Sequence, residues 1–256
     1  MGNVVKLEAL IFDVDGTLAD TERDGHRVAF NRAFESLQLD WEWSVPLYGK
    51  LLTVTGGKER INYYLQNFNA AFKGPEDMPG FIANIHAKKT EIYTAMLEQG
   101  AIPLRPGVKR LLLEARSQGY RLAIATTTTP ANVQALLEYS LAPGATAWFE
   151  VVAAGDIVPA KKPAPDIYHY ALDKLGLTAD QCIAFEDSAN GIKSSKGAGL
   201  KTIITVNDYT RDDDFGAADL VLDHLGEPDL PCRAIQGTLD SRHFVDMRII
   251  EKIHHG

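Results

Sequence analysis

The sequence predicts an α/β protein built on a doubly wound parallel sheet. Short apolar runs of strand length alternate with stretches of helical spacing along most of the chain. Continuous apolar strands are typical of a parallel sheet that is covered on both faces, and their alternation with helices favours the doubly wound arrangement. The runs expected to form strands are Ala9–Phe12, Leu122–Ala125, Val151–Ala153, Ile183–Phe185, Thr202–Val206 and Leu220–Leu222.

Helices are expected between these strands, and two of them have clear boundaries. Pro106 and Gly119 bracket one helix, and Pro165 and Gly176 bracket another. Proline favours the first turn of a helix and glycine the position after its last turn. Near the C-terminus, the stretch Phe244–Ile253 is also predicted to be helical.

Residues 20–100 interrupt this alternation. Apolar residues recur there at helical spacing, for example Phe30, Phe34 and Leu37, without a convincing strand. The stretch Lys73–Gly80 is rich in glycine and proline and is interpreted as a loop between helices. The sequence therefore predicts a core of residues 1–19 and 101–256, with a helical domain of residues 20–100 inserted into it.

Composition narrows the class of protein. The chain has 256 residues, 45% of them hydrophobic and 23% charged, which is enough to bury a core. Its formal net charge of −8 argues against a general nucleic-acid binder. No apolar run approaches the roughly 18 residues that a membrane span needs. We therefore expect neither a nucleic acid nor a membrane as partner.

The first residues and the cysteines bear on localisation. The start of the chain lacks the apolar stretch of a secretion signal, and Cys182 and Cys232 are far apart in sequence. Such thiols are expected to stay reduced. We predict a cytoplasmic protein, or a protein of an organelle stroma if a transit peptide was removed before Met1.

The first predicted strand ends in a pair of carboxylates. Asp13 and Asp15 follow it, and Gly16 then lets the chain turn away. Ligand sites of open α/β sheets lie beyond the carboxyl ends of the strands, so both carboxylates are expected at such a site. One alternative is an acidic turn that caps the next helix. An EF-hand calcium loop is excluded, because Leu18 and Asp24 replace its glycine and glutamate.

Polar residues also follow three further predicted strands. Thr126 and Thr127 begin a run of threonines that suits phosphate oxygens, or that caps the next helix. Lys162 follows the third strand and either meets a ligand or remains in solvent. Glu186 and Asp187 follow the fourth strand, where they either line the site or cap a helix.

Together the four strand ends predict one phosphate site. Carboxylates from two strand ends are hard oxygen ligands of the kind that Mg²⁺ binds. A lysine and hydroxyl groups compensate the charge of a phosphate. One carboxylate can serve as nucleophile and another as acid and base.

With these residues the sequence resembles the haloacid dehalogenase superfamily, from about Leu7 to Asp223. Its four motifs occur here in order as Asp13-x-Asp15-Gly16-Thr17, Thr126, Lys162-Pro163 and Glu186-Asp187. The resemblance implies a Rossmann-like catalytic core, and it identifies the inserted residues 20–100 as a helical cap domain.

The resemblance also implies a role for each motif residue. Asp13 would attack the phosphoryl group and become an aspartyl phosphate. Asp15 would protonate the leaving oxygen and then activate water, a role that the dehalogenases themselves lack. Thr126 and Lys162 would bind the transferred phosphoryl group.

A magnesium ion is implied as the cofactor. It would lie on the carboxylate of Asp13, the backbone carbonyl of Asp15 and the carboxylate of Asp187. Glu186 would bind it or stand beside it.

The inserted domain carries a second candidate anion site within Thr53–Arg60. Gly56 and Gly57 expose backbone amides at a helix start, and Lys58 and Arg60 add positive charge. The alternative is a loop followed by a basic helix start. Further candidates for substrate contact are Glu22, His26, His86, Lys89, Arg105 and Thr127. For the first five of these, the alternative is an ordinary surface residue.

These features are similar to the CbbY family of phosphatases associated with carbon fixation. The matching stretches are Gly56–Arg60, Ile85–Thr90, Leu104–Gly107 and Ala125–Thr128. That family removes a phosphate from xylulose 1,5-bisphosphate, an inhibitor of rubisco. The resemblance implies a Mg²⁺-dependent sugar phosphatase, and a bisphosphate would explain two anion sites.

Two alternatives remain open. A phosphomutase similar to β-phosphoglucomutase shares all four motifs and the cap, but its aspartyl phosphate survives to meet a second sugar oxygen. A non-catalytic protein that binds a phosphorylated metabolite would not need the pair Asp13 and Asp15, which argues against it. We expect a monomer whose partner is a small sugar phosphate.

Overall fold

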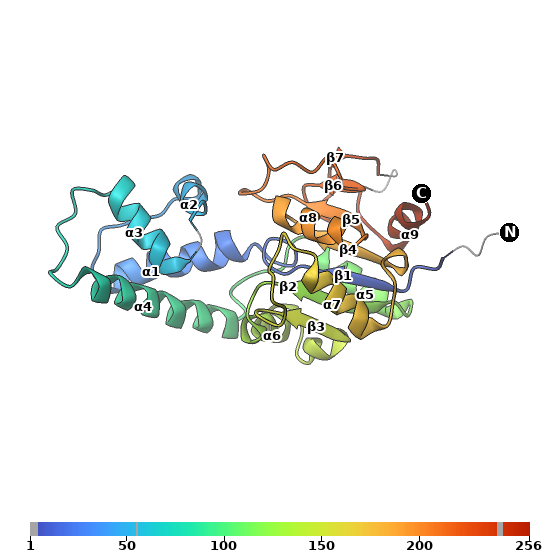
Figure 1. The fold of residues 1–256 in the computed structure, drawn as a ribbon, viewed down its shortest axis with the longest axis horizontal. Coiled ribbons are helices and arrows are strands. Elements are labelled where there is room, and N and C mark those ends of the chain that lie inside the picture. The colour runs from blue at the N-terminus through green and yellow to red at the C-terminus, as the bar shows by residue number, and fades with distance from the viewer. Residues whose placement is uncertain (1–4, 55, 240–242) are drawn as a thin grey trace. The chain divides into compact units, whose positions relative to one another are not determined.

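The parallel sheet predicted from the sequence is present in the computed structural model (Figure 1). The structure describes residues 5–54, 56–239 and 243–256. The strands lie in the order β3-β2-β1-β4-β5-β6-β7, with β1 to β6 parallel and β7 antiparallel to β6. They are β1 (Ala9–Phe12), β2 (Arg121–Thr126), β3 (Val151–Ala154), β4 (Cys182–Glu186), β5 (Lys201–Thr205), β6 (Leu220–Leu222) and β7 (Ala234–Gln236).

The first six strands match the predicted runs to within one residue at each end. The predicted α/β fold class is thereby confirmed. β7 was not predicted, because its short edge sequence contains no apolar run and its Ile235 is exposed. Strand β1 lies between β2 and β4 and is parallel to both, so the carboxyl ends of all three strands meet at one edge of the sheet.

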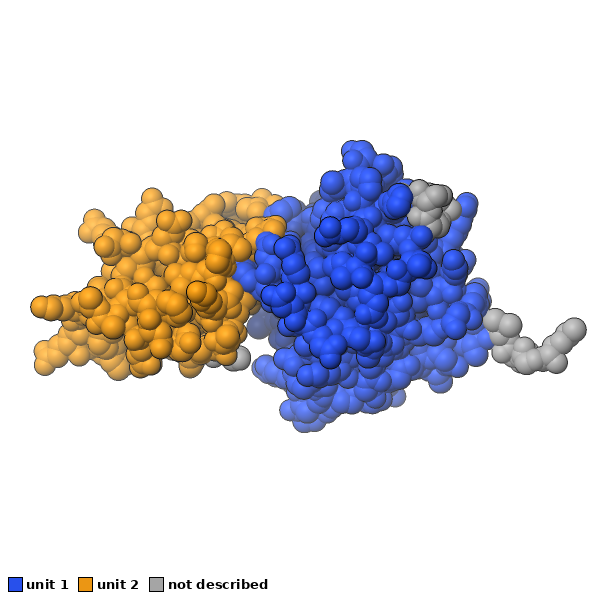
Figure 2. Space-filling view, turned by 90° about the horizontal axis from the view of Figure 1, so that it is seen from above, with its two compact units in different colours: residues 1–20, 103–256 blue, residues 21–102 orange. Residues whose placement is uncertain are grey.

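The chain divides into two compact units (Figure 2). One comprises Met1–Asp20 and Pro103–Gly256 and contains the sheet, and the other is Thr21–Ile102. We call them the core unit and the helical unit. The sequence predicts residues 20–100 for the inserted domain, whereas the helical unit begins at Thr21 and ends at Ile102.

Helices cover both faces of the sheet in the core unit. The main helices are α5 (Val108–Ser117), α6 (Pro130–Leu136), α7 (Asp166–Leu175), α8 (Ala189–Gly197) and α9 (Met247–His255). Side chains of β1 alternate between the faces, and Ala9 and Ile11 pack in one cluster with α7. All four residues of β1 are buried, as a strand covered on both faces requires.

Two helix starts differ from the predicted positions. α5 begins at Val108, two residues after Pro106, because Gly107 adopts the left-handed conformation that precedes the helix. α9 begins at Met247 instead of Phe244, because the side chain of Asp246 accepts a hydrogen bond from the backbone N–H of Ile249.

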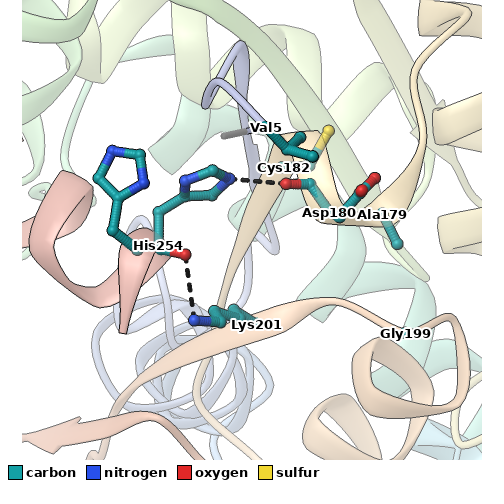
Figure 3. Close-up of a pocket in the computed structure, with 8 residues that line it drawn as sticks. Val5, Ala179, Asp180, Cys182, Gly199, Lys201 and His254 are labelled. Carbon is teal, nitrogen blue, oxygen red and sulfur yellow. Dashed lines mark hydrogen bonds between the residues drawn. The ribbon is translucent and has the colours of Figure 1, made fainter. Parts of the chain in front are cut away.

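The last turn of α9 docks where β4 and β5 begin, at the edge opposite their carboxyl ends. The ammonium group of Lys201 donates to the carbonyl oxygens of Ile253 and His254, at 2.8 and 3.1 Å. His254 Nε2 donates to the carbonyl oxygen of Asp180 at 2.6 Å (Figure 3). These contacts line a cavity of about 280 Å³ and fix the C-terminal helix to the sheet.

The helical unit consists of η1 (Thr21–His26), α1 (Arg27–Ser36), α2 (Val45–Leu51), α3 (Gly57–Asn67) and α4 (Met78–Glu98). Its core is aromatic, and Phe34 packs edge-on against Trp41 and Trp43. The predicted loop Lys73–Gly80 ends earlier than expected, since the Asp77 side chain caps α4 and brings the last three residues into the helix. No strand occurs among the described residues of this unit.

None of the helices in the described ranges combines the length and apolar character that a bilayer crossing requires.

We expect the stability of the core unit to depend on β1. Ile11 is fully buried, so Ile11→Ala should lower the free energy of unfolding by about 2–5 kcal/mol, because it removes apolar contacts and leaves a cavity. Urea unfolding followed by circular dichroism measures this. The control Leu113→Ala alters a side chain of α5 that is 43% exposed and should change little. Equal losses in the two variants would contradict this account of the core.

Candidate active site

The residues predicted at the strand ends converge at the carboxyl edge of the sheet. Asp13 directly follows β1, and its backbone N–H continues the ladder to β4 by donating to Phe185 O at 3.0 Å. Thr126 ends β2 and Glu186 ends β4, the two neighbours of β1. All three polar side chains are buried, which is unusual for such groups unless they are paired.

Lys162 joins two of these carboxylates. Its ammonium nitrogen lies 2.7 Å from Asp13 Oδ1 and 2.5 Å from Glu186 Oε1. Its side chain is only 8% exposed, which excludes the alternative of a solvated lysine. Burial alone would lower the pKa of Lys162, but Asp13 and Glu186 outweigh it and raise the pKa, so the group is an ammonium ion.

Each carboxylate of the Glu186-Asp187 pair is oriented by one further side chain. The hydroxyl of Tyr168, fully buried on α7, donates to Glu186 Oε1 at 2.5 Å. The amide of Asn207 donates to Asp187 Oδ2 at 2.7 Å. Neither residue was predicted from the sequence. Asn207 directly follows the fifth predicted strand, so the strand-end argument applies to it as well, whereas no pattern marks a tyrosine within a helix.

The donor set of this cluster fits a hard divalent cation. Asp13, Glu186 and Asp187 are buried and each offers a carboxylate oxygen within 4.8 Å of the others. Glu186 Oε2 is buried without a hydrogen-bond partner among the described residues. Three buried carboxylates with one lysine leave an excess of negative charge, which a cation bound by oxygen ligands would offset.

The acidity of the cluster reflects the same excess. Burial, followed by the charge of Asp13, raises the pKa of Glu186 to about 7 despite the opposing effect of Lys162. Burial and the charges of Asp13 and Glu186 hold the pKa of Asp187 well above its ordinary value. Protons and a divalent cation therefore compete for the same carboxylates.

The turn after Asp13 carries Asp15 and brings Gly16 to the cluster. Val14 O accepts the backbone N–H of Leu18 at 2.9 Å and closes the turn. Gly16 has φ +85°, and a Cβ there would collide with the carboxylate of Asp187. Only glycine permits both the left-handed backbone and this close approach. Asp15 is half-buried beside it.

The two threonines after β2 differ in their surroundings. Thr126 is buried, and its hydroxyl oxygen accepts the backbone N–H of Thr128 at 3.3 Å. Thr127 is exposed. The helix α6 has Thr129 at its N-cap position without a side-chain cap, so these hydroxyls do not serve the helix start as the alternative supposed.

Arg105 was predicted to contact the substrate, and the structure contradicts this prediction. Its side chain is buried in the core unit, and its guanidinium is occupied by protein oxygens. The physical reason is that the turn after Asp15 and the ends of β5 and β6 present backbone carbonyls, which a five-donor side chain can satisfy together. The oxygens bonded belong to Gly16, Thr205, Val206 and Asp223.

Glu22 and Arg60 are linked within the helical unit. Tyr48 OH donates to Glu22 Oε2 at 2.7 Å and accepts from Arg60 Nη1 at 2.7 Å. Arg60 Nη1 also lies 3.8 Å from Glu22 Oε2. The carboxylate thus neutralises a guanidinium that the sequence suggested for anion binding.

His26 and Lys89 form a second pair in this unit, with Lys89 Nζ donating to His26 Nδ1 at 2.8 Å. Burial, and also the charges of Lys89 and Arg60, lower the pKa of His26 to about 4 despite the opposing effect of Glu22. The imidazole is therefore neutral at physiological pH, with Nδ1 as acceptor.

The predicted anion loop lies at the start of α3. Gly56 is the N-cap residue of α3 and Gly57 its first residue. The ring of His86 stands so close to Gly57 that a Cβ there would overlap it. Lys58 is exposed. Thr55, part of the same predicted loop, lies outside the described residues.

Comparison with known proteins identifies the family. Residues 7–199 match the model of the haloacid dehalogenase-like hydrolases. The chain therefore belongs to the haloacid dehalogenase-like hydrolase family, and it is a phosphoric monoester hydrolase of that family.

Within the family the chain is similar to CbbY proteins, which confirms the resemblance noted from the sequence. It is 43% identical to the plasmid CbbY protein of Cupriavidus necator over 98% of both chains. The structure of a CbbY aspartate-to-asparagine mutant from Rhodobacter sphaeroides, in complex with xylulose 1,5-bisphosphate, is 47% identical with a TM-score of 0.70 and covers 87% of this chain and 96% of that one. A putative β-phosphoglucomutase from Thermotoga maritima is 26% identical with a TM-score of 0.65, covering 82% and 90%.

Glu186 is expected to make the stability of the metal-free protein depend on pH. Its folded-state pKa of about 7 lies above the ordinary 4.5, so folding favours proton uptake. This stabilisation is complete below about pH 4.5 and is lost as the pH rises through about 7. In chelator, the thermal midpoint of the wild type should therefore fall relative to that of Glu186→Gln between about pH 4.5 and about pH 7.

The comparison of the two proteins reports on Glu186 together with Asp187, whose pKa the charge of Glu186 helps to raise. His26, whose lowered pKa contributes with the opposite sign, is common to both and cancels. Parallel midpoints for wild type and variant across this range would contradict the raised pKa.

Proposed function

We propose that the protein is a Mg²⁺-dependent sugar phosphatase that hydrolyses xylulose 1,5-bisphosphate through an aspartyl phosphate on Asp13. The observation that carries the proposal is the buried cluster in which Lys162 joins Asp13 to Glu186 beside Asp187. The ligand of the Rhodobacter sphaeroides CbbY structure supports the choice of substrate.

In the proposed first step, a carboxylate oxygen of Asp13 attacks phosphorus and the bond from phosphorus to the sugar oxygen breaks. Asp15, two residues further along the turn, gives its proton to the departing oxygen. The Lys162 ammonium, 2.7 Å from Asp13 Oδ1, and the Thr126 hydroxyl bind the phosphoryl oxygens.

In the second step, water attacks the phosphorus of the aspartyl phosphate. Asp15 takes a proton from the water, the bond from phosphorus to Asp13 breaks, and inorganic phosphate leaves. Asp13 thereby returns to its carboxylate form and Asp15 to its acid form. Mg²⁺, held by Asp13, Glu186, Asp187 and the Asp15 carbonyl, would neutralise charge on the phosphoryl group.

The helical unit is proposed to be the cap that selects the substrate. Gly56, Gly57 and Lys58 would bind the distal phosphate, because backbone amides at a helix start and an exposed lysine both favour an anion. Arg60 would support this loop, given its contacts with Tyr48 and with Val54 O. The remaining proposed substrate contacts are Glu22, His26, His86 and Lys89 of this unit, and Thr127 of the core unit.

Asp13→Asn should abolish turnover and leave the fold intact. A carboxamide cannot replace the attacking carboxylate, and loss of a nucleophile costs at least ~10³-fold in kcat. Phosphate release from xylulose 1,5-bisphosphate measures the rate, and mass spectrometry of acid-quenched wild type detects the phosphoryl group on Asp13. The control Asp173→Asn changes an exposed residue of α7 and should keep full activity. Near-wild-type turnover of Asp13→Asn would overturn the covalent mechanism.

Lys58→Ala should discriminate between bisphosphate and monophosphate. A charge-assisted hydrogen bond to the distal phosphate is worth ~1.5–3 kcal/mol, so kcat/KM for xylulose 1,5-bisphosphate should fall ~10–100-fold. The values for the matching xylulose monophosphates should change little, since they have no distal group.

Lys73→Ala serves as the matched control, because Lys73 is an exposed lysine elsewhere in the helical unit. If Lys58→Ala lowers kcat/KM equally for the bisphosphate and the monophosphates, the proposed distal phosphate site is wrong. Conversion of β-glucose 1-phosphate to the 6-phosphate without release of phosphate would instead identify a phosphomutase.

A further inference from the structure

The side chain of Arg105 connects three segments of the core unit. Arg105 precedes α5 and is 7% exposed. Its Nη1 donates to two carbonyl oxygens, its Nη2 donates to two more, and its Nε lies 3.4 Å from a carboxylate oxygen of Asp20. The four carbonyls belong to Gly16, Thr205, Val206 and Asp223. The two terminal nitrogens of the guanidinium therefore donate to four carbonyls, and the third nitrogen lies beside a carboxylate.

The first segment is the turn that carries Asp15. Arg105 Nη1 donates to the carbonyl oxygen of Gly16, the residue after Asp15. The backbone N–H of Arg105 donates to Leu18 O at 2.9 Å, further along the same turn. Two bonds from one residue thus fix the turn, and with it the position of Asp15.

The second segment leads to the carboxylate of Asp187. Arg105 donates to Thr205 O at 2.9 Å and to Val206 O at 2.5 Å, at the end of β5. The next residue is Asn207, whose amide donates to Asp187 Oδ2 at 2.7 Å. The guanidinium therefore also fixes the strand end that orients a proposed metal ligand.

The two segments meet at Gly16. A Cβ on Gly16 would overlap the Asp187 carboxylate and lie 2.7 Å from Asn207 Nδ2, so the backbone of the turn rests directly on that pair. A change in the bonds of Arg105 would be transmitted to Asp15 on one side and to Asp187 on the other.

We infer that Arg105 is a positioning residue, which fixes the proposed acid and base Asp15 relative to the carboxylate of Asp187. The inference rests on the proposed function, since it concerns the proton that Asp15 gives to the leaving oxygen. Lysine cannot replace arginine here, because a single ammonium cannot reach carbonyls on separate strand ends in a planar fork. Misplacement of a reacting group by about 1 Å can cost about 10²-fold in rate.

Arg110 offers a matched control. It is also an arginine of the core unit, with Nε 3.1 Å from Glu227 Oε2 and Nη2 donating to Gly226 O at 2.8 Å. The bonds described for it reach neither the turn of Asp15 nor Asn207. Arg110→Lys therefore removes a second guanidinium clamp whose own bonds do not reach the site. Its partner Glu227 keeps its bond from the backbone N–H of Gly107, at 2.9 Å.

The test compares two esters at saturating Mg²⁺. The leaving oxygen of xylulose 1,5-bisphosphate needs a proton, whereas the nitrophenolate of p-nitrophenyl phosphate departs without one. For both esters, kcat/KM reports on the steps up to and including phosphoryl transfer to Asp13, and not on hydrolysis of the aspartyl phosphate. In Arg105→Lys we expect kcat/KM to fall ~10–100-fold for the sugar ester but less than about threefold for the nitrophenyl ester. Arg110→Lys should keep the wild-type ratio and lower only the thermal midpoint.

A second readout is independent of turnover. Calorimetric titration of Mg²⁺ without substrate should show affinity reduced several-fold in Arg105→Lys and unchanged in Arg110→Lys, because only the former loosens the strand end that orients Asp187. Unchanged Mg²⁺ affinity in Arg105→Lys would overturn the link to Asp187.

The ratio of the two esters does not depend on the folded fraction, so partial unfolding cannot imitate the expected result. Equal losses on both esters, or no loss, would overturn the inference. If Arg105→Lys does not fold, the same ratio measured in Thr205→Val tests the inference. It removes only a hydroxyl 3.2 Å from Arg105 Nη1 and should change the ratio by about threefold, whereas an unchanged ratio overturns the inference. Failure of the wild type to hydrolyse either ester would instead refute the proposed function.

Discussion

The contact of Lys162 with Asp13 and Glu186 is the interaction on which the rest of the site depends. A parallel sheet brings neighbouring strand ends together, and here two of them carry buried carboxylates that repel each other. One ammonium ion between them offsets part of that repulsion and the cost of their burial. With Asp187 added, negative charge remains in excess. That remaining excess makes the cluster suitable for holding a divalent cation.

Much of this site could be predicted because parallel strands share an edge. Once Ala9–Phe12 and Ile183–Phe185 are taken as parallel strands of one sheet, Asp13 and Glu186 must both lie at its carboxyl edge. This conclusion does not depend on the fold of the remaining chain. Tyr168 has no such signal, since its hydroxyl reaches Glu186 from the buried face of α7. The position of a tyrosine within a helix shows only that it faces the core, not which polar group it meets there.

Arg105 shows where prediction from sequence stops. An arginine before Pro106 in a phosphatase suggests an anion contact, and the local sequence offers only an exposed surface residue as the alternative. Its actual acceptors are backbone carbonyls, including those of Thr205 and Val206 about a hundred positions away. Carbonyl groups are present at every residue and leave no trace in the sequence. Which of them lack a partner depends on where β5 and β6 end in space, and that is known only from the folded chain.

The two units divide the proposed chemistry. Every group proposed to form or break a bond, together with Arg105, belongs to the core unit, where the sheet and its buried side chains hold it rigidly. The groups proposed to select the substrate are mostly in the helical unit, and they differ in how strongly the protein already neutralises them. Arg60 is committed to Tyr48 and Glu22, while Lys58 is exposed at the start of α3. Among the described residues Lys58 has no ion-pair partner, and an anion gains more from such a cation than from a paired one. The proposed distal phosphate should therefore be recognised chiefly by Lys58 and the adjacent backbone amides.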